Sequence, residues 1–321
     1  MKTIAVINQK GGCGKTTTAI NLSASLSRLG KRILLVDLDP QSHCAAGLGV
    51  PEQRIEMDIG DAMLAVQTRA IDPARLLWHP GKNLDLAPSR MRLAGLEASR
   101  GGLADLPDKE RRLSMTIAAL GNGYDYAIID CPPSIGLLTY NALAAADLVL
   151  IPVETGFFSL QGATRQLNTV RTLARRLGKP IAVRMLPTLH EENSSVAADV
   201  LTELHNRFRD RVVPVVIRRD PKLRETATFG QSIFDYAPTS IGADDYGRLA
   251  NWLVKFRVIA DEPPAAEEIA EPAPATERTE TTPAIAQPAA ATVQPTTQPD
   301  RDVQQSEVKP PSRAEEVARR A

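Results

Sequence analysis

The sequence predicts an α/β fold, with a doubly wound, mostly parallel sheet of seven or eight strands and helices on both faces. Three observations predict it. A glycine-rich loop joins an apolar run at 3–7 to a helical pattern at 17–29. Apolar runs that end in aspartate recur along the chain, and helical patterns alternate with these runs. Strand and helix in regular alternation are typical of a parallel sheet covered on both sides.

The glycine-rich loop, residues 10–17, has the composition of a phosphate-binding loop. Glycines let backbone N–H groups turn toward phosphate oxygens, and the following helix N-terminus adds partial positive charge. The predicted nucleotide-binding residues here are Lys10, Gly11, Gly12, Cys13, Gly14, Lys15, Thr16 and Thr17. Lys15 supplies a charge and Thr16 a hydroxyl for Mg²⁺. The usual pattern has a glycine at the position of Gln9, and this loop carries an additional lysine, Lys10.

Residues 17–29 form a predicted helix with Gly30 as its C-terminal stop, and 32–36 form a buried strand. Asp37 and Asp39 follow this strand. Such a pair is often only a turn that bonds nearby amides. At the carboxyl edge of a sheet beside a phosphate loop, however, one of the two suits Mg²⁺ or its water shell and the other suits an attacking water.

Further along, the apolar run 126–130 predicts a buried strand that ends in Asp130, a second carboxylate for Mg²⁺. The other elements are predicted from periodicity alone. They are a helix at 59–64, a strand at 84–86, a helix at 110–120, a strand at 147–152, a helix at 159–177, a strand at 181–186, a helix at 195–208 and a last strand at 212–217.

Composition divides the chain into a folded part, residues 1–258, and a C-terminal tail, residues 259–321. The tail holds ten of the 24 prolines and no Phe, Trp or Tyr, so we expect it to be disordered. It also holds 12 acidic and 6 basic residues, which leaves the folded part with a net charge of +6 in a chain whose total is zero. A mildly basic folded part is compatible with a polyanionic partner.

The chain has three widely spaced cysteines, an odd number that argues against a disulfide framework and for a reducing compartment. No signal peptide precedes the first strand, and no apolar run approaches the ~20 residues that cross a bilayer. We therefore expect a cytoplasmic protein.

With both Lys10 and Lys15, the loop resembles the deviant phosphate loop of the ParA/MinD family of ATPases, in which the extra lysine is the signature lysine. Residues 37–41 resemble the family's switch I, D-x-D-P-Q, and residues 130–136 its switch II, D-C-P-P-S-x-G. The resemblance implies that ATP binds with Mg²⁺ held by Thr16, Asp37 and Asp130. It assigns catalysis to Lys10, Lys15 and Asp39, with Lys10 reaching the phosphates of a second subunit in an ATP-dependent homodimer.

Residues 217–230 resemble, in part, a family segment that lies beside the adenine and carries an arginine implicated in non-specific DNA binding. By this resemblance Arg218 and Asp220 are base-contact candidates. The DNA-binding candidates are Arg218, Arg219, Lys222 and Arg224, with Arg207, Arg209 and Arg211 as further basic residues. At Asn193 this chain departs from relatives that have an arginine there.

The resemblance implies a slow ATPase, because no arginine finger is apparent near the motifs and its lack leaves hydrolysis some 10³ to 10⁵ slower. A ParB-like or cargo adaptor protein would stimulate it, and nucleoid-bound dimers would partition a chromosome or plasmid. One alternative is an ATPase that positions a protein cargo, such as a chemoreceptor cluster or microcompartment. Another is a membrane-surface ATPase of the MinD kind, which the Val- and Ala-only apolar face of 312–321 disfavours. An amidoligase of the same superfamily fits less well, because no further substrate-site constellation is present.

Overall fold

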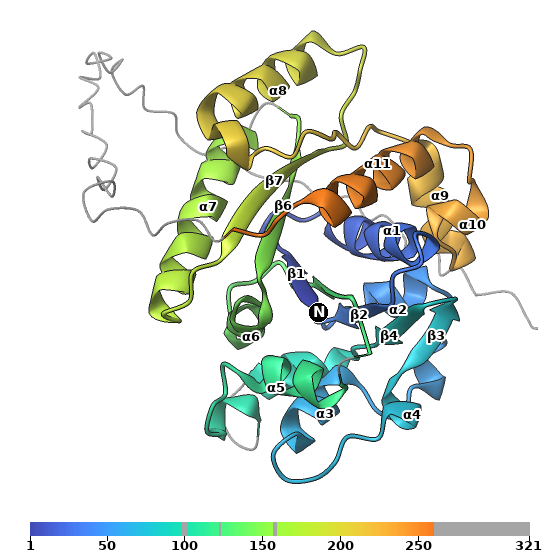
Figure 1. Cartoon of the computed structure of the whole chain (residues 1–321), viewed down its shortest axis with the longest axis vertical. Helices are drawn as coiled ribbons and strands as arrows, with labels where there is room; N and C mark the ends of the chain where they lie inside the picture. The colour runs from blue at the N-terminus through green and yellow to red at the C-terminus, as the bar shows by residue number, and fades with distance from the viewer. Residues whose placement is uncertain (98–101, 122, 157–158, 260–321) are drawn as a thin grey trace, which may run out of the picture. The chain divides into compact units, whose positions relative to one another are not determined.

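A seven-stranded sheet organises the chain, in the order β3-β4-β2-β5-β1-β6-β7 (Figure 1). The computed structural model describes residues 1–97, 102–121, 123–156 and 159–259. The strands are β1 (Lys2–Val6), β2 (Ile33–Asp37), β3 (Trp78–Gly81), β4 (Leu84–Ala87), β5 (Tyr126–Asp130), β6 (Leu148–Glu154) and β7 (Ala182–Thr188). All neighbouring pairs are parallel except β3 with β4. The predicted fold class is confirmed.

Helices cover both faces of this sheet. Those in the described residues are α1 (Lys15–Arg28), α2 (His43–Gly47), α3 (Ile59–Ala65), α4 (Pro73–Leu76), α5 (Arg112–Ala119), α6 (Leu137–Ala145), α7 (Ser159–Arg176), α8 (Ser195–Phe208), α9 (Pro221–Phe229), α10 (Ile233–Tyr236) and α11 (Ile241–Lys255). Figure 1 shows α1 and α11 side by side on one face, and α5, α6 and α7 on the other.

The alternation of side chains along β1 divides the interior into two apolar cores. Ile4 and Val6 belong to the core under α1 and α11, whereas Ala5 and Ile7 belong to the core under α3, α5, α6 and α7. Successive residues of a strand point to opposite faces, so a sheet buried on both faces needs continuous apolar runs. This requirement explains why the central strands read as unbroken apolar segments.

Two strand predictions differ from the structure. The predicted strand at 212–217 does not form. Among the described residues this segment runs beside β7 but makes only isolated backbone contacts, such as the hydrogen bond from Val213 N–H to Met185 O at 2.8 Å. Pro214 has no N–H to donate, which interrupts a ladder. The second difference is β3, a strand that the sequence pattern does not predict. It contains Pro80, and a proline argues against a central strand. As an antiparallel edge strand with an irregular register, β3 tolerates a proline.

The predicted tail from residue 259 lies outside the described residues, apart from Ile259 itself. In the part of the chain that the structure describes, none of the helices combines the length and the apolar character needed to cross a bilayer.

Candidate functional site

The functional groups meet where β1, β2 and β5 end. Val6 and Asp37 both lie opposite Asp130 in the sheet register, so the loop after β1 and two aspartates share one edge. The helix α1 begins immediately beyond the loop. Ligands of open α/β sheets bind at the carboxyl ends of the strands, where the strand order reverses.

The loop between β1 and α1 has the backbone of an anion cradle. Gly12 has a φ of 72° and Gly14 a φ of 90°, conformations that L side chains rarely adopt. Gly14 is the N-cap of α1, no side chain of the described residues caps this end, and the first turn of α1 holds no acidic residue. The Thr188 hydroxyl donates to the Cys13 carbonyl at 2.9 Å and holds the loop against β7. The N–H groups at the start of α1 are therefore available to phosphate oxygens.

The two loop lysines have different environments. Lys15 is only 8% exposed, and its Nζ donates to the Lys10 carbonyl at 3.3 Å. The Lys10 side chain is 52% exposed and forms an ion pair with Glu154 at the end of β6. Lys15 is thus positioned inside the cradle, while Lys10 lies at its rim.

Beneath the cradle, Asp130 lies beside Thr16 and opposite Asp37, the three residues proposed from the sequence to hold Mg²⁺. The Thr16 hydroxyl donates to Asp130 Oδ2 at 2.6 Å. Burial, opposed by the hydrogen bond from Thr16, raises the pKa of Asp130 to about 7. Burial and the adjacent Asp130 charge raise the pKa of Asp37 well above its usual range.

Asp130 Oδ1 is buried and has no hydrogen-bond partner among the described residues. An unpartnered buried carboxylate oxygen costs free energy unless a cation or a donor meets it. Two carboxylates and a hydroxyl are the oxygen donors that Mg²⁺ prefers. The residues present therefore fit a magnesium site.

Asp39 is held by the turn after β2. Its Oδ1 accepts the N–H of Gln41 at 3.0 Å, its carbonyl accepts the Ser89 hydroxyl at 2.5 Å, and its own N–H donates to Asp37 Oδ1 at 3.1 Å. These bonds fix the position of Asp39, which lines the cavity beside the loop. Asp37 and Asp39 therefore accept hydrogen bonds from backbone N–H groups of the turn, and Asp39 also lines the cavity.

A cavity of about 570 Å³ opens over the loop, within the size range of small-molecule sites. One end is lined by loop residues, namely Gly11, Gly12, Gly14, Lys15, Thr16 and Thr17. The other end is lined mainly by the segment before and within α9, namely Ile217, Arg219, Asp220, Pro221, Leu223 and Arg224. The cavity therefore joins a phosphate-binding end to a partly apolar end.

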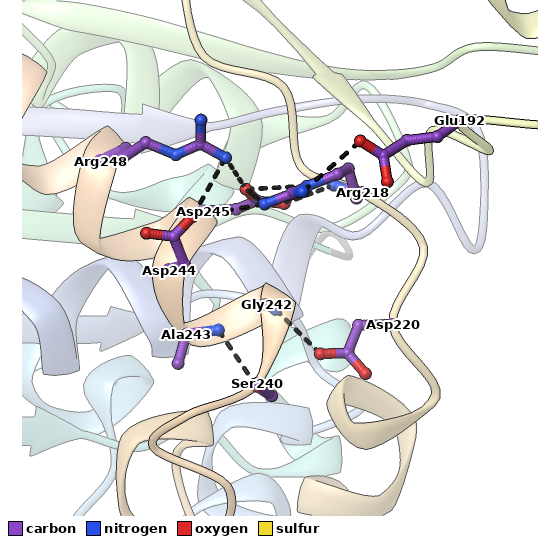
Figure 2. A network of polar contacts seen from close by, with 9 residues as sticks. All are labelled: Glu192, Arg218, Asp220, Ser240, Gly242, Ala243, Asp244, Asp245 and Arg248. Atoms are coloured by element: carbon purple, nitrogen blue, oxygen red, sulfur yellow. Dashed lines mark hydrogen bonds and ion pairs between the residues drawn. The ribbon is translucent and has the colours of Figure 1, made fainter.

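Arg218, predicted for base or DNA contact, takes part in an ion-pair network (Figure 2). Its N–H and guanidinium donate to Asp245 of α11, with Nη2 to Oδ1 at 2.7 Å, and Arg248 contacts the same carboxylate. Asp245 is fully buried, and Glu192 and Asp244 lie at the edge of the network. The network ties the segment 212–220 to α11.

Asp220, the other base-contact candidate, joins two helix N-termini. Its Oδ1 accepts the N–H of Lys222 in α9 at 2.9 Å, and its Oδ2 accepts the N–H of Gly242 in α11 at 2.8 Å (Figure 2). Asp220 borders the cavity, yet both carboxylate oxygens are engaged in capping.

The remaining DNA-binding candidates lie near the surface with acidic neighbours. Arg219 is 47% exposed and pairs with Glu191 at 2.9 Å, and Lys222 pairs with Glu225 at 2.8 Å. Arg224 is exposed and lines the cavity. The glutamates reduce the local positive potential without removing the cations from solvent.

The sequence did not single out four residues that the structure adds to the site. Glu154 pairs with Lys10, Thr188 holds the loop, Tyr246 of α11 lines the cavity, and Cys44 lies beside Asp130. Of these four residues, only Glu154 could have been identified as a site candidate from the sequence, because it is an acidic residue at the end of an apolar run. The other three depend on contacts across the fold.

Comparisons with known proteins agree with this geometry. A family model described as an AAA domain matches residues 1–183. The sporulation initiation inhibitor protein Soj of Bacillus subtilis is 41% identical over 250 residues, which cover 78% of this chain and 96% of Soj. The chromosome partitioning protein ParA of Myxococcus xanthus is 38% identical over 255 residues, covering 78% and 87%.

Among solved structures, cobyrinic acid a,c-diamide synthase from Mycobacterium smegmatis, with bound ADP and magnesium, matches with a TM-score of 0.67. It is 29% identical, and the match covers 82% of this chain and all of that one. The likeness extends over the described sheet and its helices.

Proposed function

The chain belongs to the ParA family of P-loop ATPases, and from this premise we propose that it is an ATP-dependent DNA-binding dimer that partitions a chromosome or plasmid. In the proposal, ATP binds with Mg²⁺ in the cavity over the loop, two subunits close face to face, and the dimer binds nucleoid DNA without sequence preference. A ParB-like or cargo adaptor protein then stimulates slow hydrolysis and releases the dimer.

The observation that carries the proposal is the separation of the two loop lysines. Lys15 is buried in the cradle, where it can bind the phosphates of its own subunit. Lys10 is half exposed, and its side chain forms one ion pair among the described residues, with Glu154, a type of contact worth about 0–1 kcal/mol at a surface. Exchanging Glu154 for a phosphate of a second subunit therefore costs little. This difference supports a cradle that is completed by dimerisation.

The chain's own groups have distinct parts in hydrolysis. The loop amides and Lys15 hold the phosphates, and Thr16, Asp37 and Asp130 would hold Mg²⁺, which neutralises charge on the phosphates when bound. Asp39, fixed by its turn, orients the attacking water. Lys10 of the second subunit adds positive charge to the transferring phosphoryl group.

The proposal is tested by the mass of the protein in solution with ATP and with ADP, measured by light scattering after size exclusion. We expect ATP to double the mass of the wild type. Lys10→Ala should remain monomeric with ATP, and Asp39→Ala should remain dimeric because it binds ATP but does not hydrolyse it. Lys82→Ala, an exposed lysine in the turn between β3 and β4, is the matched control. A Lys10→Ala dimer with normal turnover would contradict the proposal.

The nature of the cargo is a separate part of the proposal. The ParA relative of Myxococcus xanthus, 38% identical, is a chromosome partitioning protein, which favours DNA over a protein assembly as the cargo. The diamide synthase shares the fold at lower identity, and the site here is explained by nucleotide-binding groups alone. Pull-down assays with this chain as bait distinguish these cargoes: one assay uses a purified DNA-bound adaptor as prey, and the other uses a chemoreceptor or microcompartment protein.

A further inference from the structure

Three buried side chains converge beneath the phosphate-binding loop: Asp37, Cys44 and Asp130. Asp37 ends β2, Asp130 ends β5, and Cys44 lies in the first turn of α2. None of the three is exposed to solvent. One potential ligand atom from each lies within 4.8 Å of the others.

The backbone fixes the thiol in this cluster. Asp37 Oδ2 accepts the N–H of Cys44 at 3.0 Å, which orients the start of α2. This contact leaves Cys44 Sγ at 3.5 Å from Asp130 Oδ2. A thiol that donates a weak hydrogen bond to a carboxylate is the simplest explanation of that distance.

A hydrogen bond alone, however, leaves the cluster incomplete. Asp130 Oδ2 already accepts from Thr16, while Asp130 Oδ1 is buried without a partner in the described part of the chain. The cluster therefore combines an unpartnered buried oxygen with a neighbouring sulfur donor. Such an oxygen is satisfied by a cation.

The donor set is chemically mixed. Mg²⁺ takes oxygen ligands and gains nothing from sulfur, whereas Zn²⁺ binds both carboxylate oxygen and thiolate sulfur. On a tetrahedral zinc, Zn–S and Zn–O bonds of about 2.3 and 2.1 Å place sulfur and oxygen about 3.6 Å apart. The separation between Cys44 Sγ and Asp130 Oδ2 is 3.5 Å. Three protein ligands with an open fourth position are also a common zinc arrangement.

We propose that Asp37, Cys44 and Asp130 form a binding site for a thiophilic divalent cation, Zn²⁺ or a similar ion, in the nucleotide-free protein. As the metal–sulfur bond forms, the thiol proton leaves to solvent, and no oxidant or reductant is required. The site shares two carboxylates with the proposed magnesium site, so it rests on that part of the proposed function but not on dimerisation or DNA binding. Because the two sites share Asp37 and Asp130, Zn²⁺ bound here competes with Mg²⁺ for these carboxylates.

The test uses Co²⁺ as a spectroscopic substitute for Zn²⁺. The full chain, freed of metal and nucleotide, is titrated with Co²⁺ while the near-ultraviolet absorbance is recorded. We expect a thiolate-to-cobalt charge-transfer band that saturates at one ion per chain and disappears when Zn²⁺ is added. Cys44→Ser should lose the band and bind Zn²⁺ at least about tenfold more weakly.

The other two cysteines provide matched controls. Cys131 is equally buried but bonds the Ile129 carbonyl, and Cys13 donates to the Lys10 carbonyl. Cys131→Ser and Cys13→Ser should each keep the band. These two variants keep the test decisive even if Cys44→Ser fails to fold, because loss of the band in either one would assign the sulfur to that cysteine and overturn the proposal.

A wild type that binds Co²⁺ without the band, or that does not bind it, would also overturn the inference. Mass measurements with ATP separate this failure from that of the proposed function. A charge-transfer band without ATP-dependent dimerisation supports the metal site and refutes the dimer. Dimerisation without the band refutes the thiophilic site alone.

Discussion

At the scale of single residues, the two buried aspartates have the clearest consequence for stability. Asp37 and Asp130 are fully buried, lie opposite each other in the sheet register, and both have a raised pKa. Burial disfavours their charged forms, and each charge disfavours the other. A divalent cation would offset both effects, so the pair that destabilises the metal-free protein at neutral pH suits the proposed magnesium site.

This leads to a pH prediction for the protein without metal or nucleotide. Asp130 has a pKa of about 7 when folded and about 3.9 when unfolded. Between these values the folded state binds the extra proton, so the free energy of unfolding falls as pH rises from about 4 to about 7. Asp130→Asn cannot ionise. We therefore expect the free energy of unfolding of this variant, relative to that of the wild type, to rise by more than about 1 kcal/mol from pH 5 to pH 8.

Urea unfolding in the presence of a chelator at the two pH values measures this gain. Asp147→Asn, which changes an aspartate at the opposite end of the sheet, controls for a general loss of charge. A stability difference between Asp130→Asn and wild type that is the same at both pH values would show that Asp130 does not titrate in this range.

The ion-pair network of Arg218 yields a second prediction at residue scale. Removing Arg218 leaves the buried Asp245 carboxylate with Arg248 as its remaining cationic partner among the described residues (Figure 2). Loss of one partner from a buried ion pair is strongly destabilising, and we expect Arg218→Ala to lower the free energy of unfolding by about 3 kcal/mol. Arg219→Ala removes an exposed pair and should cost less than about 1 kcal/mol.

Urea unfolding of the two variants measures the difference. It also decides how DNA-binding data are interpreted, because a destabilised Arg218→Ala protein loses DNA binding indirectly. Equal stability of the two variants would mean that Arg218 is free to serve a ligand.

At the scale of elements, α2 and α9 meet through two glycines. Gly49 follows α2, Gly230 caps α9, and a Cβ added to Gly230 would lie 2.6 Å from Gly49 Cα. Gly230 also has a φ of +63°. The backbone of the segment after Asp39 is therefore packed directly against the helix that carries the candidate DNA-binding residues. A change in one displaces the other.

We predict that Gly230→Ala destabilises the protein by about 2 kcal/mol, because it combines a backbone clash with a left-handed conformation. Gly162→Ala is the matched control: Gly162 lies in α7, and none of the described residues outside the helix backbone comes within 4 Å of the added Cβ, so this change should stabilise by about 0.5–1 kcal/mol. Thermal unfolding of both variants tests the pair. A neutral Gly230→Ala would show that α2 and α9 separate easily.

The elements also show what the sequence could predict. The strands that end in Asp37 and Asp130 were found because burial on both faces produces continuous apolar runs. The edge strand β3 was missed, since its Pro80 and mixed polarity carry no such pattern. The segment 212–217 is apolar enough for a strand, yet Pro214 and its position beyond β7 leave it without a ladder.

The site residues, like the strands, could be predicted from the sequence only where they follow a recognisable apolar run. The loop residues, Asp37, Asp39 and Asp130 follow from their positions after predicted strands, because parallel strands deliver their ends to one edge. Cys44 and Tyr246 reach the site through the packing of α2 and α11. No spacing rule connects residue 44 to residue 130, so only the folded structure brings a thiol to the carboxylates of the proposed metal site.

At the scale of the whole molecule, charge is divided along the chain. The predicted folded part, residues 1–258, carries a net charge of +6, and residues 259–321 carry 12 acidic and 6 basic residues. An acidic segment tethered to a basic one competes with DNA phosphates for the same Lys and Arg side chains. The proposed DNA affinity is therefore a property of the entire sequence and not only of Arg219, Lys222 and Arg224.

We predict that a chain ending at residue 258 binds non-specific DNA several-fold more tightly with ATP at 50 mM salt than the full chain does, because the competing acidic segment is gone. The difference should shrink at 200 mM salt, where all phosphate contacts weaken. Fluorescence anisotropy with a labelled duplex measures both affinities. In the shortened chain, Arg219→Ala should reduce the salt dependence by about one phosphate contact, whereas Lys82→Ala should not change it. Equal affinity of the full and shortened chains would show that the acidic segment does not compete for this surface.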